Sequence, residues 1–126
     1  MVSFENFSME DGIPIYQQII LFLKRGMAAG AVTNGDELPS RRVLSALLGV
    51  NPNTVQKAYR MLEDEGLIQS HTGSKSYAAA DEATVARLRA ELLQEDVRAL
   101  VSAMKQSGVS RDAALNLISK MWEETT

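Results

Sequence analysis

A short run of polar side chains has the composition of a surface that reads nucleic-acid bases. Asn53, Thr54 and Gln56 stand close together, and Lys57 and Arg60 follow with no acidic residue among them. Asparagine and glutamine can form two hydrogen bonds with adenine, threonine offers a hydroxyl and a methyl group, and basic side chains neutralise phosphates. An ordinary solvated helix face with polar caps would have a similar composition. The run therefore favours base reading only where one element presents these residues together.

The apolar residues of the same stretch predict that the polar set lies on the outer face of a helix. Four of them recur at helical spacing and are expected to face a core: Val55, Ala58, Tyr59 and Leu62. Gly66 is expected to end this helix. The start of such a helix fits the major groove of DNA, where every base pair shows its own pattern of donors and acceptors.

A second, shorter helix is predicted immediately before this one. Ser40 is a suitable N-cap for it, the leucine-rich residues 44–48 supply its apolar face, and Gly49 ends it. Asn51 then caps the next helix, with Pro52 at the first helical position, where a missing amide is harmless. A connection this short that starts with glycine forces the second helix steeply across the first. The pair is a predicted helix-turn-helix.

A β-hairpin is predicted directly after the two helices. Residues 67–70 form its first strand, residues 71–75 its turn and residues 76–78 its returning strand. Gly73 and Lys75 lie at its tip, where backbone and ammonium can approach a phosphate or the minor groove. The hairpin makes the predicted unit a winged helix-turn-helix.

The composition gives little support for catalysis. The 126 residues include no cysteine and one histidine, so these residue types cannot form a metal cluster. The chain has no glycine loop that would cradle a phosphate and no plausible arrangement of serine, histidine and acid. We therefore expect no enzymatic activity, no catalytic residue, no metal and no cofactor.

The formal net charge of −3 is unevenly distributed along the chain. Residues 38–78 carry five basic and three acidic side chains, a net charge of +2, whereas residues 1–37 carry −3 and residues 79–126 carry −2. The three acids of the central segment stand at the far end of the predicted recognition helix. The field at its groove-facing start is therefore more positive than the total suggests.

Helices are also predicted on both sides of the central unit. Residues 1–11 contain few packing signals apart from Phe4 and Phe7 and are expected to form a loose arm, whereas residues 14–29 form an amphipathic helix that packs behind the helix-turn-helix. The apolar run of that helix is too short to cross a membrane. Beyond the hairpin, a capped long helix is predicted over residues 81–107 and a second one over residues 110–123.

These last two helices carry more apolar surface than a helical pair can bury by itself, which predicts an association surface. The expected contact residues are Leu88, Leu92, Leu93, Val97, Leu100, Val101, Met104, Leu117, Ile118, Met121 and Trp122. The expected partner is a second copy of the chain, because a twofold dimer would place two recognition helices on successive major grooves. Two helices can hardly enclose a cavity for a ligand, so no effector is identified.

Several short motifs stand in an order that is specific. They are PIYQQI at residues 14–19, LPS at 38–40 with arginine at 42, GVN at 49–51 and EGL at 65–67. Over residues 10–78 the chain thereby resembles the GntR family of bacterial transcription regulators, and the run VNPNTVQKAY is similar to its YtrA-like subfamily. Lys75 departs from the family pattern, because it stands where such wings often have a second glycine.

The predicted fold is mainly α with a small β-wing: a winged helix-turn-helix DNA-binding domain over residues 10–78, followed by a two-helix dimerisation tail over residues 81–126. The residues that this prediction and the resemblance place at the DNA are Ser40, Arg41, Arg42, Asn51, Asn53, Thr54, Gln56, Lys57, Arg60, Thr72, Gly73 and Lys75. Arg41 and Arg42 have a second interpretation, as plain surface charges of the first helix.

The sequence therefore predicts a homodimeric, cytoplasmic transcription regulator that binds a palindromic DNA operator and represses its own operon. Resemblance to the YtrA-like proteins implies transporter genes as targets. The alternative is a protein-interaction module built on a winged helix that does not bind DNA, because a fold does not dictate a function. In that case the polar and basic residues of the central segment would have no shared purpose.

Overall fold

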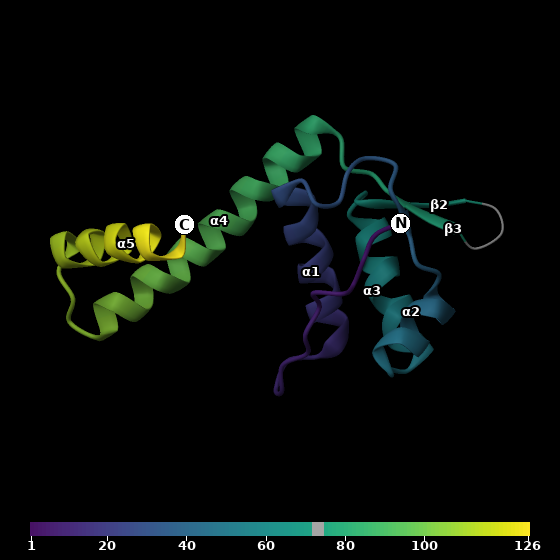
Figure 1. Cartoon of the computed structure of the whole chain (residues 1–126), viewed down its shortest axis with the longest axis horizontal. Helices are drawn as coiled ribbons and strands as arrows, with labels where there is room; N and C mark the ends of the chain where they lie inside the picture. The colour runs from purple at the N-terminus through teal and green to yellow at the C-terminus, as the bar shows by residue number, and fades with distance from the viewer. Residues whose placement is uncertain (72–74) are drawn as a thin grey trace. The chain divides into compact units, whose positions relative to one another are not determined.

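Helices α1, α2 and α3 and a small sheet form the first of two compact units, residues 1–90, in a computed structural model that describes residues 1–71 and 75–126 (Figure 1). The elements of this unit are α1 (Ile15–Ala29), β1 (Glu37–Leu38), α2 (Arg41–Leu48), α3 (Pro52–Asp64), β2 (Ile68–His71) and β3 (Lys75–Ala78). Helix α4 (Glu82–Gln106) begins in the first unit and continues into the second, residues 91–126, which also holds α5 (Arg111–Thr125).

The two helices of the helix-turn-helix begin where the sequence predicts. The hydroxyl of Ser40 accepts a hydrogen bond from the Val43 amide at 3.1 Å, and the Asn51 side chain accepts one from the Asn53 amide at 2.8 Å. Gly49 ends α2 with φ of 67°, a left-handed conformation that costs glycine least. These caps fix the short connection between α2 and α3.

The predicted core face of α3 is confirmed. Val55, Ala58, Tyr59 and Leu62 are all 0% exposed. The same helix packs against α1, whose buried residues Ile19, Leu23 and Met27 recur at helical spacing. One face of α3 is thus wholly internal, and the opposite face is left to solvent.

The wing is part of a three-stranded antiparallel sheet with the order β1-β3-β2. Strands β2 and β3 match the predicted hairpin within one residue, with Ile68 opposite Ala78 and His71 opposite Lys75. Strand β1 was not predicted, because two residues are too few to show the alternation that identifies a strand. It joins the base of the wing to the segment that leads into α2.

The expectation of a loose N-terminal arm is wrong. Val2 and Phe4 are buried, and the Val2 amide donates to the Glu37 carbonyl at 2.8 Å. The Phe4 ring stacks on Phe22 of α1 with 4.9 Å between ring centres, and Phe7 meets the same ring edge-on at 5.3 Å. An irregular segment shows no periodicity in sequence, so its packing became visible only in the structure.

The start of α4 belongs to the first unit. Leu88 is 2% exposed, and the Arg89 guanidinium donates from Nε and Nη2 to the Ala28 carbonyl at 3.1 and 2.7 Å. That carbonyl lies at the C-terminal end of α1, where carbonyls lack helical partners and attract a cation. The first compact unit therefore extends to Ala90, and Leu88, which was expected in the dimer surface, is buried within its own chain.

The second unit is a helical hairpin with a large exposed apolar surface. The Ser110 hydroxyl caps α5 by accepting from the Ala113 amide at 3.2 Å. Leu93, Val97, Leu100, Val101, Leu117, Ile118, Met121 and Trp122 are all exposed, and Leu92 and Met104 are half-buried. Among the described residues, no helix is both long and apolar enough to span a bilayer.

Replacement of Tyr59 by phenylalanine tests the link between α3 and the start of α2. The buried Tyr59 hydroxyl donates to the Pro39 carbonyl at 2.7 Å, and burial raises the pKa of this phenol above its ordinary value. Tyr59→Phe leaves a buried carbonyl without its partner, so we expect a loss of about 1–3 kcal/mol in the free energy of unfolding. Urea denaturation measures it. Tyr16→Phe, which removes a surface hydroxyl, is the matched control and should lose much less.

Candidate nucleic-acid interface

The first two turns of α3 present most of the predicted base-reading residues on one solvent face. Asn53, Gln56, Lys57 and Arg60 are exposed, and Thr54 is half-buried. The side-chain amides of Asn53 and Gln56 make no hydrogen bond to any residue that the structure describes. Both amides are therefore free to bind an incoming donor or acceptor.

Two of the residues predicted to contact DNA, Ser40 and Asn51, cap helices in this unit. The Ser40 hydroxyl and the Asn51 side-chain oxygen are occupied as helix caps, as described above. Ser40 is half-buried and Asn51 is exposed. Their caps orient the N-terminal amides of α2 and α3, where the helix dipole favours an anion.

Tyr16 of α1 also contributes to this face, although it is not among the residues predicted to contact DNA. The Lys57 ammonium lies 4.0 Å from the centre of the Tyr16 ring, a cation–π contact between α3 and α1. The Tyr16 hydroxyl accepts from the Gln17 side chain at 3.2 Å. A signal was present, because an aromatic residue beside the apolar stripe of an amphipathic helix often holds a surface contact.

The two adjacent arginines of α2 have different surroundings. Arg42 is exposed, whereas the Arg41 side chain is 24% exposed and donates to Glu63 Oε1 at 2.9 Å. The Arg41 guanidinium also lies 5.4 Å from the centre of the Tyr59 ring. The structure therefore places Arg42 with the outward cations and gives Arg41 an anionic partner inside the same chain.

The acids at the end of α3 are largely matched by cations. Besides the Glu63 pair with Arg41, Glu65 accepts from the Lys24 ammonium of α1 at 2.9 Å. Such pairs add little stability at a surface, but each cancels a negative charge near the polar face. The exposed cations Lys57 and Arg60 of α3, Arg42 of α2 and Lys75 of β3 thus meet less negative charge from the end of α3 than the sequence suggests.

The wing contributes Lys75, which is exposed at the start of β3. It stands opposite His71, whose ring meets Tyr77 edge-on with 5.0 Å between ring centres. Thr72 and Gly73, also expected at the DNA, lie outside the described residues. Over residues 1–71 and 75–126 no group of three or more His, Cys, Asp and Glu residues could hold a metal ion.

Known proteins resemble this chain in both sequence and structure. The model of the family described as bacterial regulatory proteins, gntR family, matches residues 15–77. The chain is 36% identical over 97 residues to the HTH-type transcriptional repressor YtrA of Bacillus subtilis (strain 168), which covers 76% of this chain and 75% of that protein.

Two solved structures extend the comparison. A GntR family transcriptional regulator from Listeria monocytogenes has a TM-score of 0.82 at 28% identity, over 89% of this chain and 98% of that chain. AraR(DBD) in complex with an operator has a TM-score of 0.50 at 25% identity, over 63% of this chain and 95% of that chain.

The salt dependence of binding to random-sequence duplex DNA tests Arg42 and Lys75. Replacing either by alanine should lower affinity for every sequence and make the slope of log K against log salt shallower by about 0.9 for each phosphate contact that is lost. Fluorescence anisotropy across a salt series measures this slope. Lys120→Ala removes an exposed cation of the second unit and serves as the control. Unchanged slopes for both test variants would contradict the assignment.

Proposed function

Because the chain belongs to the GntR family of bacterial regulatory proteins and is 36% identical to one helix-turn-helix transcriptional repressor, we propose that it binds a specific DNA operator and represses transcription from it. The observation that carries this proposal is the pair of free amides, Asn53 and Gln56, on the exposed face at the start of α3. The buried face of α3 fixes the backbone of the helix that carries these two residues, so both side chains are kept on its solvent side.

The charges around the amides fit a duplex that enters along the start of α3. In the proposed complex the first turns of α3 lie in the major groove, and Arg42 on α2 and Lys75 on β3 contact phosphates. The Tyr16 ring holds the Lys57 ammonium by a cation–π contact. The ammonium protons that point away from the ring can then bind the DNA backbone. Phosphate contacts set the register, and the amides supply the sequence preference.

The base-reading role is tested with Asn53→Ala and Gln56→Ala. A sequence selected from a random duplex library provides the specific ligand, and a scrambled duplex of equal length provides the nonspecific one. Each variant should lose about 1–3 kcal/mol on the selected sequence and little on the scrambled one, because base-edge bonds discriminate between sequences. Equal losses on both duplexes would contradict base reading by these residues.

Repression of its own operon is the regulatory form that we propose. A relative that is 36% identical is itself a transcriptional repressor, and resemblance to the YtrA-like proteins favours transporter genes as the targets. A mobility shift with the promoter upstream of the protein's own gene, followed by transcription of that fragment in vitro, tests this. A shift together with fewer transcripts would support repression, whereas a shift with more transcripts would indicate activation.

The second unit supplies the proposed dimer contact. Residues from α4 and α5 line an apolar groove of about 350 Å³, formed by Leu100, Met104, Leu117, Ile118, Met121, Trp122 and Thr125. Trp122, the largest of these side chains, is 70% exposed. A contiguous apolar surface of this kind marks an association site, and a second copy offers the same surface by twofold symmetry. Such a dimer would bind a palindromic operator.

A charge placed in the groove tests the dimer. Ile118→Asp should shift the protein from dimer to monomer at micromolar concentration and should lower operator affinity at least tenfold, because binding of the second half-site is then no longer intramolecular. Analytical ultracentrifugation and anisotropy measure the two effects. Asn116→Asp puts the same charge at an exposed position of the same helix and should leave both unchanged. A wild-type protein that is still a monomer at the concentrations at which it binds the operator would contradict the proposed dimer.

A further inference from the structure

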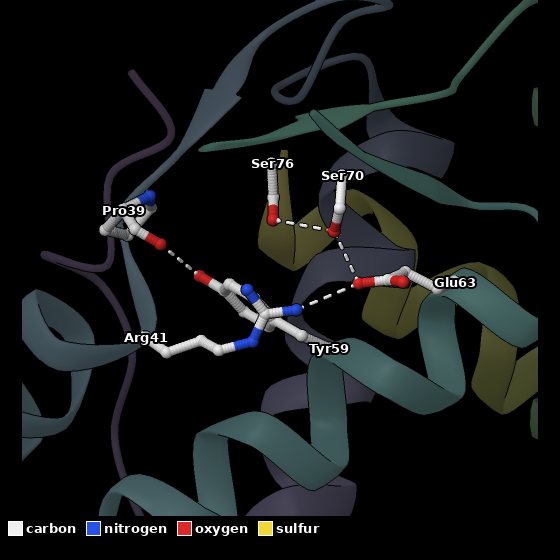
Figure 2. Close-up of polar contacts among 6 residues, drawn as sticks. All are labelled: Pro39, Arg41, Tyr59, Glu63, Ser70 and Ser76. Atoms are coloured by element: carbon white, nitrogen blue, oxygen red, sulfur yellow. Dashed lines mark hydrogen bonds and ion pairs between the residues drawn. The ribbon is translucent and has the colours of Figure 1, made fainter. Parts of the chain in front are cut away.

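A single carboxylate connects the first helix of the helix-turn-helix to the wing. Glu63, in the last turn of α3, accepts with Oε1 from Arg41 Nη2 at 2.9 Å and from the Ser70 hydroxyl at 2.6 Å (Figure 2). Ser70 lies directly opposite Ser76 in the hairpin, and their hydroxyl oxygens are 3.3 Å apart. This polar chain therefore runs from α2 through α3 to both strands of the wing.

The hydrogen bonds that link Arg41, Glu63, Ser70 and Ser76 are partly shielded from solvent. The Arg41 and Glu63 side chains are 24% and 33% exposed, and Ser76 is buried. The Arg41 Nε is buried with no hydrogen-bond partner among the described residues. Ionic hydrogen bonds of this kind are stronger than those between neutral groups, and shielding reduces their screening by salt. Arg41 is therefore paired with Glu63 of the same chain, whereas its neighbour Arg42 is exposed.

The outer part of the wing has little apolar packing of its own. In β2 only Ile68 is buried, and Gln69, Ser70 and His71 are exposed. Core contacts fix the base of the hairpin, because Ile68 and Ala78 are both buried. Beyond that base, the bond from Ser70 to Glu63 ties β2 to the recognition helix.

We propose that Glu63 and Arg41 are positioning residues that hold the wing at a fixed angle to the recognition helix, and that Arg41 does not itself contact DNA. The proposal rests on DNA binding by this chain. Glu63 acts through Ser70 on the strand pair that carries Lys75, one residue before Ser76. Arg41 acts by holding the Glu63 carboxylate in place.

The direction in which one substitution changes the affinity for DNA distinguishes a positioning role from a simple charge effect. Glu63→Gln removes a negative charge near the DNA-binding face, which by charge alone should strengthen binding to DNA. If the carboxylate positions the wing, the same change weakens binding. Glu65→Gln is the matched control, because it removes the neighbouring acid, which pairs with Lys24 and is not bonded to the wing in the described structure.

The experiment measures binding of the full chain to its selected duplex over a salt series. We expect Glu63→Gln to weaken binding about tenfold, the scale of one lost ionic hydrogen bond, while Glu65→Gln stays equal to or tighter than the wild type. Arg41→Met should also weaken binding but keep the wild-type salt slope. A phosphate contact by Arg41 would instead make that slope shallower by about 0.9.

Two further measurements keep the test decisive. In the double variant Glu63→Gln/Lys75→Ala, the loss should be smaller than the sum of the two single losses, because a misplaced wing has already lost the Lys75 contact. Ser70→Ala, at an exposed position, breaks the same connection without changing any charge and should reproduce the weaker binding even where an ionic variant is poorly folded. Thermal unfolding followed by circular dichroism checks the fold of each variant.

The outcomes separate this inference from the proposed function. Wild-type protein that binds no selected duplex would refute DNA binding itself. Wild-type protein that binds, together with Glu63→Gln no weaker than Glu65→Gln, would refute the positioning role alone. A shallower salt slope for Arg41→Met would show that Arg41 contacts a DNA phosphate and would contradict its proposed positioning role.

Discussion

Complete burial of one face of α3 is the constraint on which the rest of the first unit depends. Burying a valine or leucine side chain contributes roughly 1.5–3 kcal/mol, and Val55 and Leu62 are both 0% exposed. A rotation of α3 about its axis would expose them, so the opposite face is fixed as well. The hydrogen bond from the Tyr59 hydroxyl to the Pro39 carbonyl extends this constraint to the start of α2. The direction in which the polar face points is therefore a direct consequence of the packing of the apolar one.

Packing in the first unit also determines which charges are paired within the chain. The chain is acidic as a whole, yet Glu63 and Glu65 at the end of α3 are paired with Arg41 and Lys24. The pairs leave the exposed cations near the start of α3 and on β3 as the local source of field. The interaction of an acidic protein with an anionic polymer depends on this local arrangement, because screening in salt removes the influence of distant charges.

Much of this architecture could be predicted from the sequence, since it rests on local signals. Caps, glycines and helical periodicity identified α2, α3 and α5, strand signals identified the hairpin, and the short motifs pointed to the GntR family. The contacts that could not be predicted join residues far apart in sequence. The pairing of Arg41 with Glu63, the burial of Leu88 and the packing of Phe4 each depend on tertiary placement, which neither spacing nor composition encodes. Arg41 and Arg42 look equivalent in sequence for this reason.

The burial of the N-terminal segment affects how the protein can be handled and degraded. Phe4 and Phe7 cover the Phe22 ring, and the Val2 amide occupies the carbonyl of Glu37 at the sheet edge. Proteolytic trimming past Phe7 would uncover an aromatic ring and free a strand-edge acceptor, both of which promote aggregation. An affinity tag placed ahead of Met1 would likewise extend from a folded segment, so a tag there needs a flexible linker that leaves Val2 in its place.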